Sequence, residues 1–144
     1  MKDFTELSDK DRELLLQFPA YITLLAANMD EKIDEEEKKA AVWLTHIKTF
    51  STEPELHPFY KLAEISLEKN IQLLDEALPK ARTERTEAIK QALVKIDHVL
   101  QQMRIDYVNT LRRSMRSYKD HVSKAHRNIL EYFIFPIPID GISD

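Results

Sequence analysis

The chain contains a single glycine, Gly141, among its 144 residues. Tight hairpin turns rely on glycine for positive backbone φ angles, and the loops that cradle phosphate groups are glycine-rich. The sequence therefore argues against an all-β fold and against the Rossmann and Walker nucleotide-binding motifs. Hydrophobic residues make up 43% of the chain and charged residues 32%, which is typical of a compact helical protein with a well-solvated surface.

Length and composition further limit the kinds of protein and of binding site that the chain can form. A chain of this length fits one domain, 1–144, with a sizeable core. Cysteine is absent, which excludes disulfides, thiolate zinc sites and cysteine nucleophiles. The N-terminus lacks the apolar core of a signal peptide, and no apolar run approaches the ~20 residues of a membrane span. We therefore expect a soluble, cytoplasmic protein.

Apolar residues recur at steps of three and four from Asp9 to Asn28, the pattern of an amphipathic helix. Ser8, with Asp11 in the following turn, predicts where this helix begins. Pro19 interrupts the run because proline lacks a backbone donor and clashes with the preceding turn. It predicts either a kink or a break into two helices, with the proline in the first turn of the second.

Two further helices are expected in the middle of the chain. The first spans Glu35–Lys48, and the loop Phe50–Pro58 follows it. Pro58 suits a first helical position, so the second helix should begin there and continue to about Leu78. Pro79 ends it, because a proline cannot continue the hydrogen-bonding of the helix.

The longest helical pattern covers Glu84–Phe133 without a proline or glycine. A single helix over this stretch would be ~75 Å long, whereas a compact domain of this size has a radius of gyration of ~15 Å. We therefore expect a break near Gln101–Asp106 or near Tyr118–His121, rather than a projecting helix that pairs with another chain. The fold prediction is an all-α, single-domain bundle of five to seven helices.

The last residues, 134–144, alternate apolar side chains with two prolines and should form a short extended tail. They are too apolar to remain in solvent. The tail is expected either to seal a groove on its own bundle or to dock on a partner protein.

Six of the nine residues in Met29–Glu37 are carboxylates, the densest acidic cluster of the chain. Asp30, Asp34 and Glu37 could converge on a divalent cation such as Ca²⁺ or Mg²⁺, with Glu36 as a spare ligand. An EF-hand is excluded, since Glu35 stands at the glycine position of that loop. The alternative needs no ion: Asp34 caps a helix, Glu37 completes a capping box, and the acids favour the helix dipole.

The run Leu24–Ala40, L-L-A-A-N-M-D-E-K-I-D-E-E-E-K-K-A, resembles the signature of TerB-like domains of the tellurite-resistance type. In that signature an apolar helix ends in an Asp, a turn with a buried aliphatic residue follows, and a Glu begins the next helix. Asp30, Ile33 and Glu37 stand at those positions, and Glu31 replaces the expected glycine. The resemblance implies an all-α fold, divalent-cation binding by these acids, and a role in bacterial stress or envelope-associated complexes.

No constellation points to an enzyme. The five histidines form neither an H-E-x-x-H motif nor an E-x-x-H pair, so zinc-protease and di-iron signatures are missing. The serines lie outside any G-x-S-x-G or S-x-x-K context. We therefore expect a protein without catalytic activity.

Charge is distributed unevenly along the chain. Residues 1–76 carry nine Lys/Arg against 17 Asp/Glu, whereas residues 104–127 carry seven Lys/Arg against two Asp. Tyr107 and Tyr118 interleave the basic segment but occupy apolar-face positions, where core packing is expected. The overall acidity argues against nucleic-acid binding. The basic segment, residues 104–127, could instead be a solvated face. It could also complement the acidic first part of the chain, residues 1–76, or an acidic partner.

The sequence thus predicts a non-enzymatic TerB-like binding module that holds a divalent cation at the Asp30–Glu37 junction. The alternative is a helical oligomer or adaptor without an ion site. It would bind a protein partner, or a second copy of the chain, through its C-terminal helix and tail.

Overall fold

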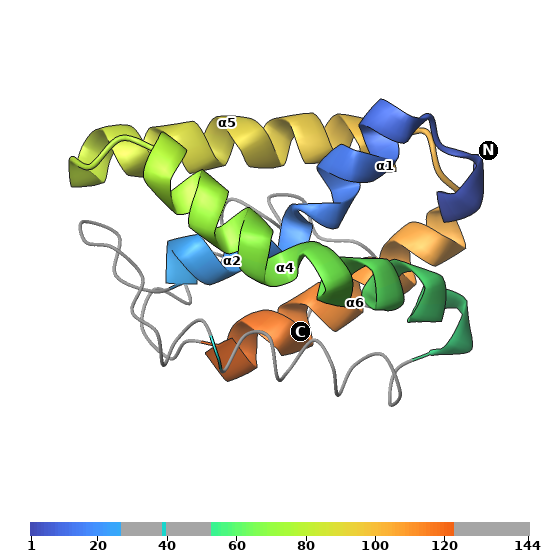
Figure 1. The fold of residues 1–144 in the computed structure, drawn as a ribbon. Helices are drawn as coiled ribbons and strands as arrows, with labels where there is room; N and C mark the ends of the chain where they lie inside the picture. Colours follow the sequence, from blue (N-terminus) through green and yellow to red (C-terminus); the bar gives the residue numbers. More distant parts are fainter. Residues whose placement is uncertain (27–38, 40–52, 123–144) are drawn as a thin grey trace.

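A computed structural model describes residues 1–26, 39 and 53–122, and these residues form helices (Figure 1). The N-terminal part contains the 3-10 helix η1 (Phe4–Glu6) and the helices α1 (Asp9–Leu16) and α2 (Phe18–Ala26). The later part contains η2 (Pro54–Leu56), α4 (His57–Ala77), α5 (Arg82–Leu100) and α6 (Ile105–Val122). Within these ranges there is no strand, only one isolated bridge between Lys2 and Met103. The all-α prediction is confirmed.

The first helical run is divided in two. Ser8 Oγ accepts a hydrogen bond of 3.1 Å from the backbone N–H of Asp11, so the predicted helix start is confirmed. Helix α1 ends at Leu16, and α2 begins at Phe18, which places Pro19 in its first turn. Of the two outcomes allowed by the sequence, the chain takes the break rather than a kink within one helix. The proline costs little there, because first-turn N–H groups have no partner within a helix.

Prolines also set both ends of α4. Pro58 occupies the first turn of the helix, which begins one residue earlier than predicted. At the other end, Leu78 donates its backbone N–H to the carbonyl of Leu74 at 2.9 Å before Pro79 ends the hydrogen-bonding pattern. The predicted bounds of this helix are therefore confirmed to within one residue.

The long apolar pattern breaks at the first of the two predicted places, between α5 and α6. The N-terminal segment, Met1–Asp3, is hydrogen-bonded to this turn through its backbone. Lys2 donates its N–H to the carbonyl of Gln102 at 2.9 Å and accepts from the N–H of Arg104 at 3.2 Å. The apolar spacing runs through the turn without interruption because both helices bury the same stripe in one core.

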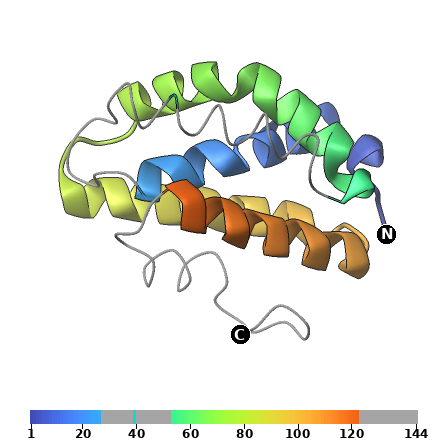
Figure 2. The same ribbon diagram turned by 90° about the horizontal axis from the view of Figure 1, so that it is seen from below.

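Helix α2 is the central element. It contacts α1, α4, α5 and α6, and Figure 2 shows α4 on one side of it and α5 and α6 on the other. This position explains why α2 is apolar on all sides and why its residues from Phe18 to Leu25 are buried. The inner face of α4 packs against it with fully buried residues: Phe59, Ala63, Leu67 and Ile71.

Several predictions concern residues outside the described ranges: the helix Glu35–Lys48 apart from Lys39, which is helical, the junction Met29–Glu37 and the tail 134–144. Among the helices that are described, none combines the length and the apolar character needed to cross a bilayer.

Candidate binding site

The predicted cation ligands Asp30, Asp34 and Glu37, and the spare ligand Glu36, lie outside the described residues, so their convergence stays a prediction. Leu24 and Leu25, at the start of the TerB-like run, are described and fully buried in α2. Within the ranges that the structure describes, no three His, Cys, Asp or Glu side chains gather where they could hold a metal ion.

A small pocket lies where the N-terminal segment and η1 meet η2 and the starts of α4 and α6. Its volume is about 200 Å³. Seven residues from these elements line it: Asp3, Phe4, Thr5, Glu55, Pro58, Arg104 and Tyr107. We call it the N-terminal pocket. The backbone hydrogen bonds of Lys2 hold the N-terminal segment beside the start of α6. They thereby position the wall of the pocket that this segment forms.

An ion pair between the two oppositely charged parts of the sequence borders this pocket. Arg104 Nε lies 2.7 Å from Asp3 Oδ1, and both side chains are about half exposed. Asp3 Oδ1 is itself buried, so the guanidinium of Arg104 meets it as a close ion pair. Among the residues that the structure describes, this ion pair joins the acidic first part of the chain to the basic segment.

Tyr107 supplies a second buried oxygen. The residue is 3% exposed, and its hydroxyl makes no hydrogen bond within the described part of the chain. Burial raises the pKa of Tyr107, and the charges of Glu55 and Asp3 raise it further. The phenol is therefore neutral at physiological pH, and its oxygen lies in the negative potential of two carboxylates that line the same pocket.

Aromatic contacts support the apolar wall of the pocket. Phe4 is 3% exposed and meets Phe59 edge-to-face, with ring centroids 5.8 Å apart and an interplanar angle of 83°. Phe59 in turn packs edge-to-face on Tyr60 at 5.2 Å. The 3-10 helix η1 is thereby anchored to the first turn of α4.

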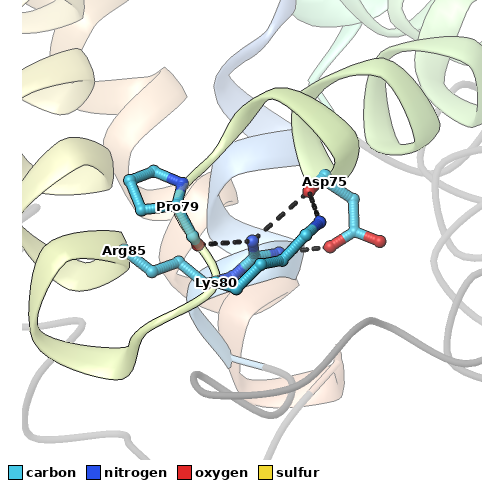
Figure 3. A network of polar contacts seen from close by, with 4 residues as sticks. All are labelled: Asp75, Pro79, Lys80 and Arg85. Carbon is cyan, nitrogen blue, oxygen red and sulfur yellow. Dashed lines mark hydrogen bonds and ion pairs between the residues drawn. The ribbon is translucent and has the colours of Figure 1, made fainter.

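A buried charged network connects α4 and α5 at the other end of the bundle (Figure 3). The Arg85 guanidinium donates to the carboxylate of Asp75, to the Asp75 carbonyl at 3.4 Å and to the Pro79 carbonyl at 3.2 Å. Lys80 Nζ adds a bond to the Asp75 carbonyl at 3.3 Å. Because these groups bind one another and close the connection between two helices, we interpret the network as structural.

Two pairs of hydroxyl groups join helices inside the bundle. Thr23 Oγ1 bonds the carbonyl of Pro19 at 2.8 Å and the Tyr118 hydroxyl at 2.9 Å, which joins α2 to α6. Tyr60 on α4 shares a hydrogen bond with Ser114 on α6. Burial raises the pKa of Tyr60, so this hydroxyl also stays neutral. These pairs fix the helices relative to one another.

Helix α4 presents apolar side chains to solvent as well as to the core. Leu62, Ile65 and Leu73 are 41%, 75% and 52% exposed. At 100° per residue they fall within one sector of the helix, opposite the face that packs on α2. We call these three residues the outer face of α4.

Sequence reasoning did not assign a site to Asp3, Glu55 or Tyr107. It placed Tyr107 correctly in the core and noted that the acidic and basic parts could face each other. That charge complementarity was the one signal available. Charge complementarity alone does not identify which acidic and basic residues form an ion pair, because residues far apart in the sequence are brought together only by tertiary contacts.

Comparisons with known proteins gave no match. No family model matches the chain, and neither a curated protein nor a solved structure is similar to it. The resemblance of Leu24–Ala40 to TerB-like domains therefore remains a resemblance of a short motif.

Proposed function

We propose that the protein is a non-enzymatic interaction module that pairs with a second copy of itself through the outer face of α4. The observation that carries this proposal is the exposure of Leu62, Ile65 and Leu73 along one side of a helix whose other side is fully buried. Adjacent exposed apolar residues are typical of interaction surfaces, whereas isolated ones are not. The aliphatic part of Lys69, which lies between Ile65 and Leu73, extends the apolar strip.

The charges along α4 support a pairing with itself. If two α4 helices run antiparallel about a two-fold axis near position 68, Leu62 lies opposite Leu73 of the second copy. The same axis brings exposed residues of opposite charge together at the ends of the strip, with Lys61 near Glu76. The sequence of the helix is thus self-complementary in both apolar and charged positions, as an isologous interface requires.

The size of this surface limits the affinity. With 21 residues, α4 is about 31 Å long, and one face about 10 Å wide offers roughly 300 Å². Stable interfaces bury about 800 Å² on each partner. The proposed dimer is therefore weak, with a dissociation constant in the micromolar range or above.

Sedimentation velocity over a wide range of protein concentration tests the proposal. The average mass of the 16.9 kDa chain should rise toward twice that value at high concentration. Ile65→Glu should abolish the rise. Val94→Glu, at a residue that is 45% exposed on α5, is the matched control and should behave as the unaltered protein. A chain that stays monomeric throughout, or an Ile65→Glu variant that still associates, would contradict the proposal.

Charge reversal provides an independent check of the antiparallel register. Lys61→Glu should weaken association, because it places two acids opposite each other. Lys61→Glu combined with Glu76→Lys should restore it. If the double variant associates no better than the single one, the helices do not pair in this register.

A second candidate function, divalent-cation binding, is favoured by the acidic cluster. Six carboxylates within Met29–Glu37 and the resemblance to TerB-like domains support a site made by Asp30, Asp34 and Glu37. Calcium and magnesium titrations followed by the melting temperature test it. The melting temperature should rise with metal, and Asp30→Asn/Glu37→Gln should abolish that rise. No shift at millimolar metal would exclude the site. A stress- or envelope-associated role depends on the same resemblance.

The apolar residues of the tail, 134–144, support a role of the tail in binding a partner protein. Deletion of Pro136–Asp144 tests whether the tail belongs to the bundle. Loss of stability would indicate that it seals a groove on its own chain. Unchanged stability together with altered self-association would indicate that it contributes to an interface.

A further inference from the structure

We propose that the segment Met1–Asp3 is a releasable strap, and that its release opens an apolar pocket between the end of α5 and the start of α6. The proposal involves no residue of the outer face of α4, so it does not depend on self-association. The pocket has a volume of about 260 Å³. Met1 forms one of its walls, and Leu100, Met103 and Val108 supply its buried apolar lining. We call it the α5–α6 pocket.

Exposed contacts hold the strap beside the turn that joins α5 to α6 (Figure 1). Lys2 donates its N–H to the Gln102 carbonyl at 2.9 Å and accepts the N–H of Arg104 at 3.2 Å. Asp3 forms the half-exposed ion pair with Arg104 and donates its N–H to the Glu6 carboxylate at 2.7 Å. None of the three strap residues is fully buried. A segment with few buried apolar contacts and exposed hydrogen bonds opens locally at a fraction of the free energy of global unfolding.

Phe4 limits the release to the residues that precede it. Its side chain is buried, and its ring meets Phe59 of α4 edge-to-face. Withdrawal of this ring would expose a large apolar surface to water, which is far less favourable than the loss of an exposed ion pair. The strap therefore hinges between Asp3 and Phe4, while η1 stays docked on the bundle.

Release of the strap uncovers the lining of the α5–α6 pocket. Lys2 forms the isolated bridge with Met103, so the strap lies directly alongside this residue. With the strap in place, Leu100, Met103 and Val108 are 4%, 1% and 4% exposed. Because Met1 precedes Lys2, it leaves its wall of the pocket when the bonds of Lys2 break. The strap and the pocket thus form one element with a closed and an open state.

Amide hydrogen exchange of the full chain, followed by NMR, tests the release. The N–H groups of Lys2 and Arg104 should exchange with one common opening free energy, since a single opening frees both. The matched control is the N–H of Val108, which bonds the Arg104 carbonyl at 3.0 Å in the first turn of α6 and should be better protected. Equal protection of all three amides would contradict the proposal, because the strap would then leave only when α6 unfolds.

The variant Asp3→Asn tests the hold of the ion pair on the strap. It removes the charge that Arg104 meets and keeps the backbone N–H that bonds Glu6. Protection of the Lys2 and Arg104 amides should fall by up to about fivefold, as expected for the loss of an exposed ion pair. Asp9→Asn is the matched control, because it breaks the exposed pair with Arg12 on α1 and should leave both amides unchanged.

Oxidation of Met103 by hydrogen peroxide reports whether release opens the pocket. The sulfur takes one oxygen atom from the peroxide, which leaves as water, and peptide mass spectrometry measures the sulfoxide. Asp3→Asn should speed this oxidation by the factor by which it lowers amide protection. Met115, fully buried on α6, should stay unaffected. An unchanged Met103 rate despite lowered amide protection, or an equal increase at Met115, would overturn the proposal.

Discussion

The guanidinium of Arg85 on α5 donates to the carboxylate of Asp75 on α4, and the two side chains are 2% and 9% exposed. A buried pair of this kind replaces the hydration that both charges lose on folding. The same guanidinium also holds the carbonyls of Asp75 and Pro79, so it closes the connection between the helices from inside (Figure 3). This arginine therefore links the end of α4 to the start of α5.

Arg85→Met should lower the free energy of unfolding by about 3–5 kcal/mol, because it leaves the Asp75 carboxylate buried without its partner. Urea denaturation followed by circular dichroism measures the loss. The double variant Arg85→Met/Asp75→Leu should recover much of it, since no uncompensated charge remains. A double variant as unstable as the single one would show that the carbonyl contacts, and not the charge pair, carry the stability.

Arg104→Met should cost less than about 1 kcal/mol in the same measurement. Its pair with Asp3 is half exposed, and solvent screens exposed ion pairs strongly. The comparison with Arg85→Met separates the effect of burial from that of ion pairing as such. An equally large loss for both variants would mean that the N-terminal segment, rather than the ion pair, is required for the fold.

Stability should fall as the pH rises above about 10. Burial raises the pKa of Tyr21, Tyr60 and Tyr107 above the ordinary value of 10.0. Above that pH the unfolded chain releases protons that the folded chain retains, so each fully shifted tyrosine lowers the free energy of unfolding by about 1.4 kcal/mol per pH unit. Below it these groups are protonated in both states and contribute no slope. Urea denaturation from about pH 8 to about pH 11 should show the decline, and Tyr107→Phe should reduce its slope. An unchanged slope in this variant would contradict the assignment to Tyr107.

Thr23→Val should destabilise the protein by about 1 kcal/mol, since it removes the hydrogen bond between the Thr23 and Tyr118 hydroxyls. The matched control is Thr110→Val. Thr110 is also buried, but its hydroxyl donates to the Asp106 carbonyl within its own helix, so a smaller loss is expected. Thermal unfolding by calorimetry measures both. Equal losses would show that the bond between α2 and α6 adds nothing beyond local packing.

The helices and most of their ends follow from local sequence. Ser8 begins α1 because its hydroxyl accepts the N–H of Asp11, and Pro19, Pro58 and Pro79 mark helix ends because proline donates no hydrogen bond. The same reasoning placed Tyr107 in the core from its apolar spacing alone. These features depend on residues within a few positions of one another, and a single sequence records them directly.

Tertiary structure decided what local spacing left open. The apolar pattern allowed a break at Gln101–Asp106 or at Tyr118–His121, and the chain turns at the first, where Lys2 binds both sides of the turn. The N-terminal pocket likewise required Asp3 and Tyr107 to meet from opposite ends of the described chain. Contacts of this kind arise only when the packed helices fix distant segments side by side. The periodicity of any one segment carries no record of them.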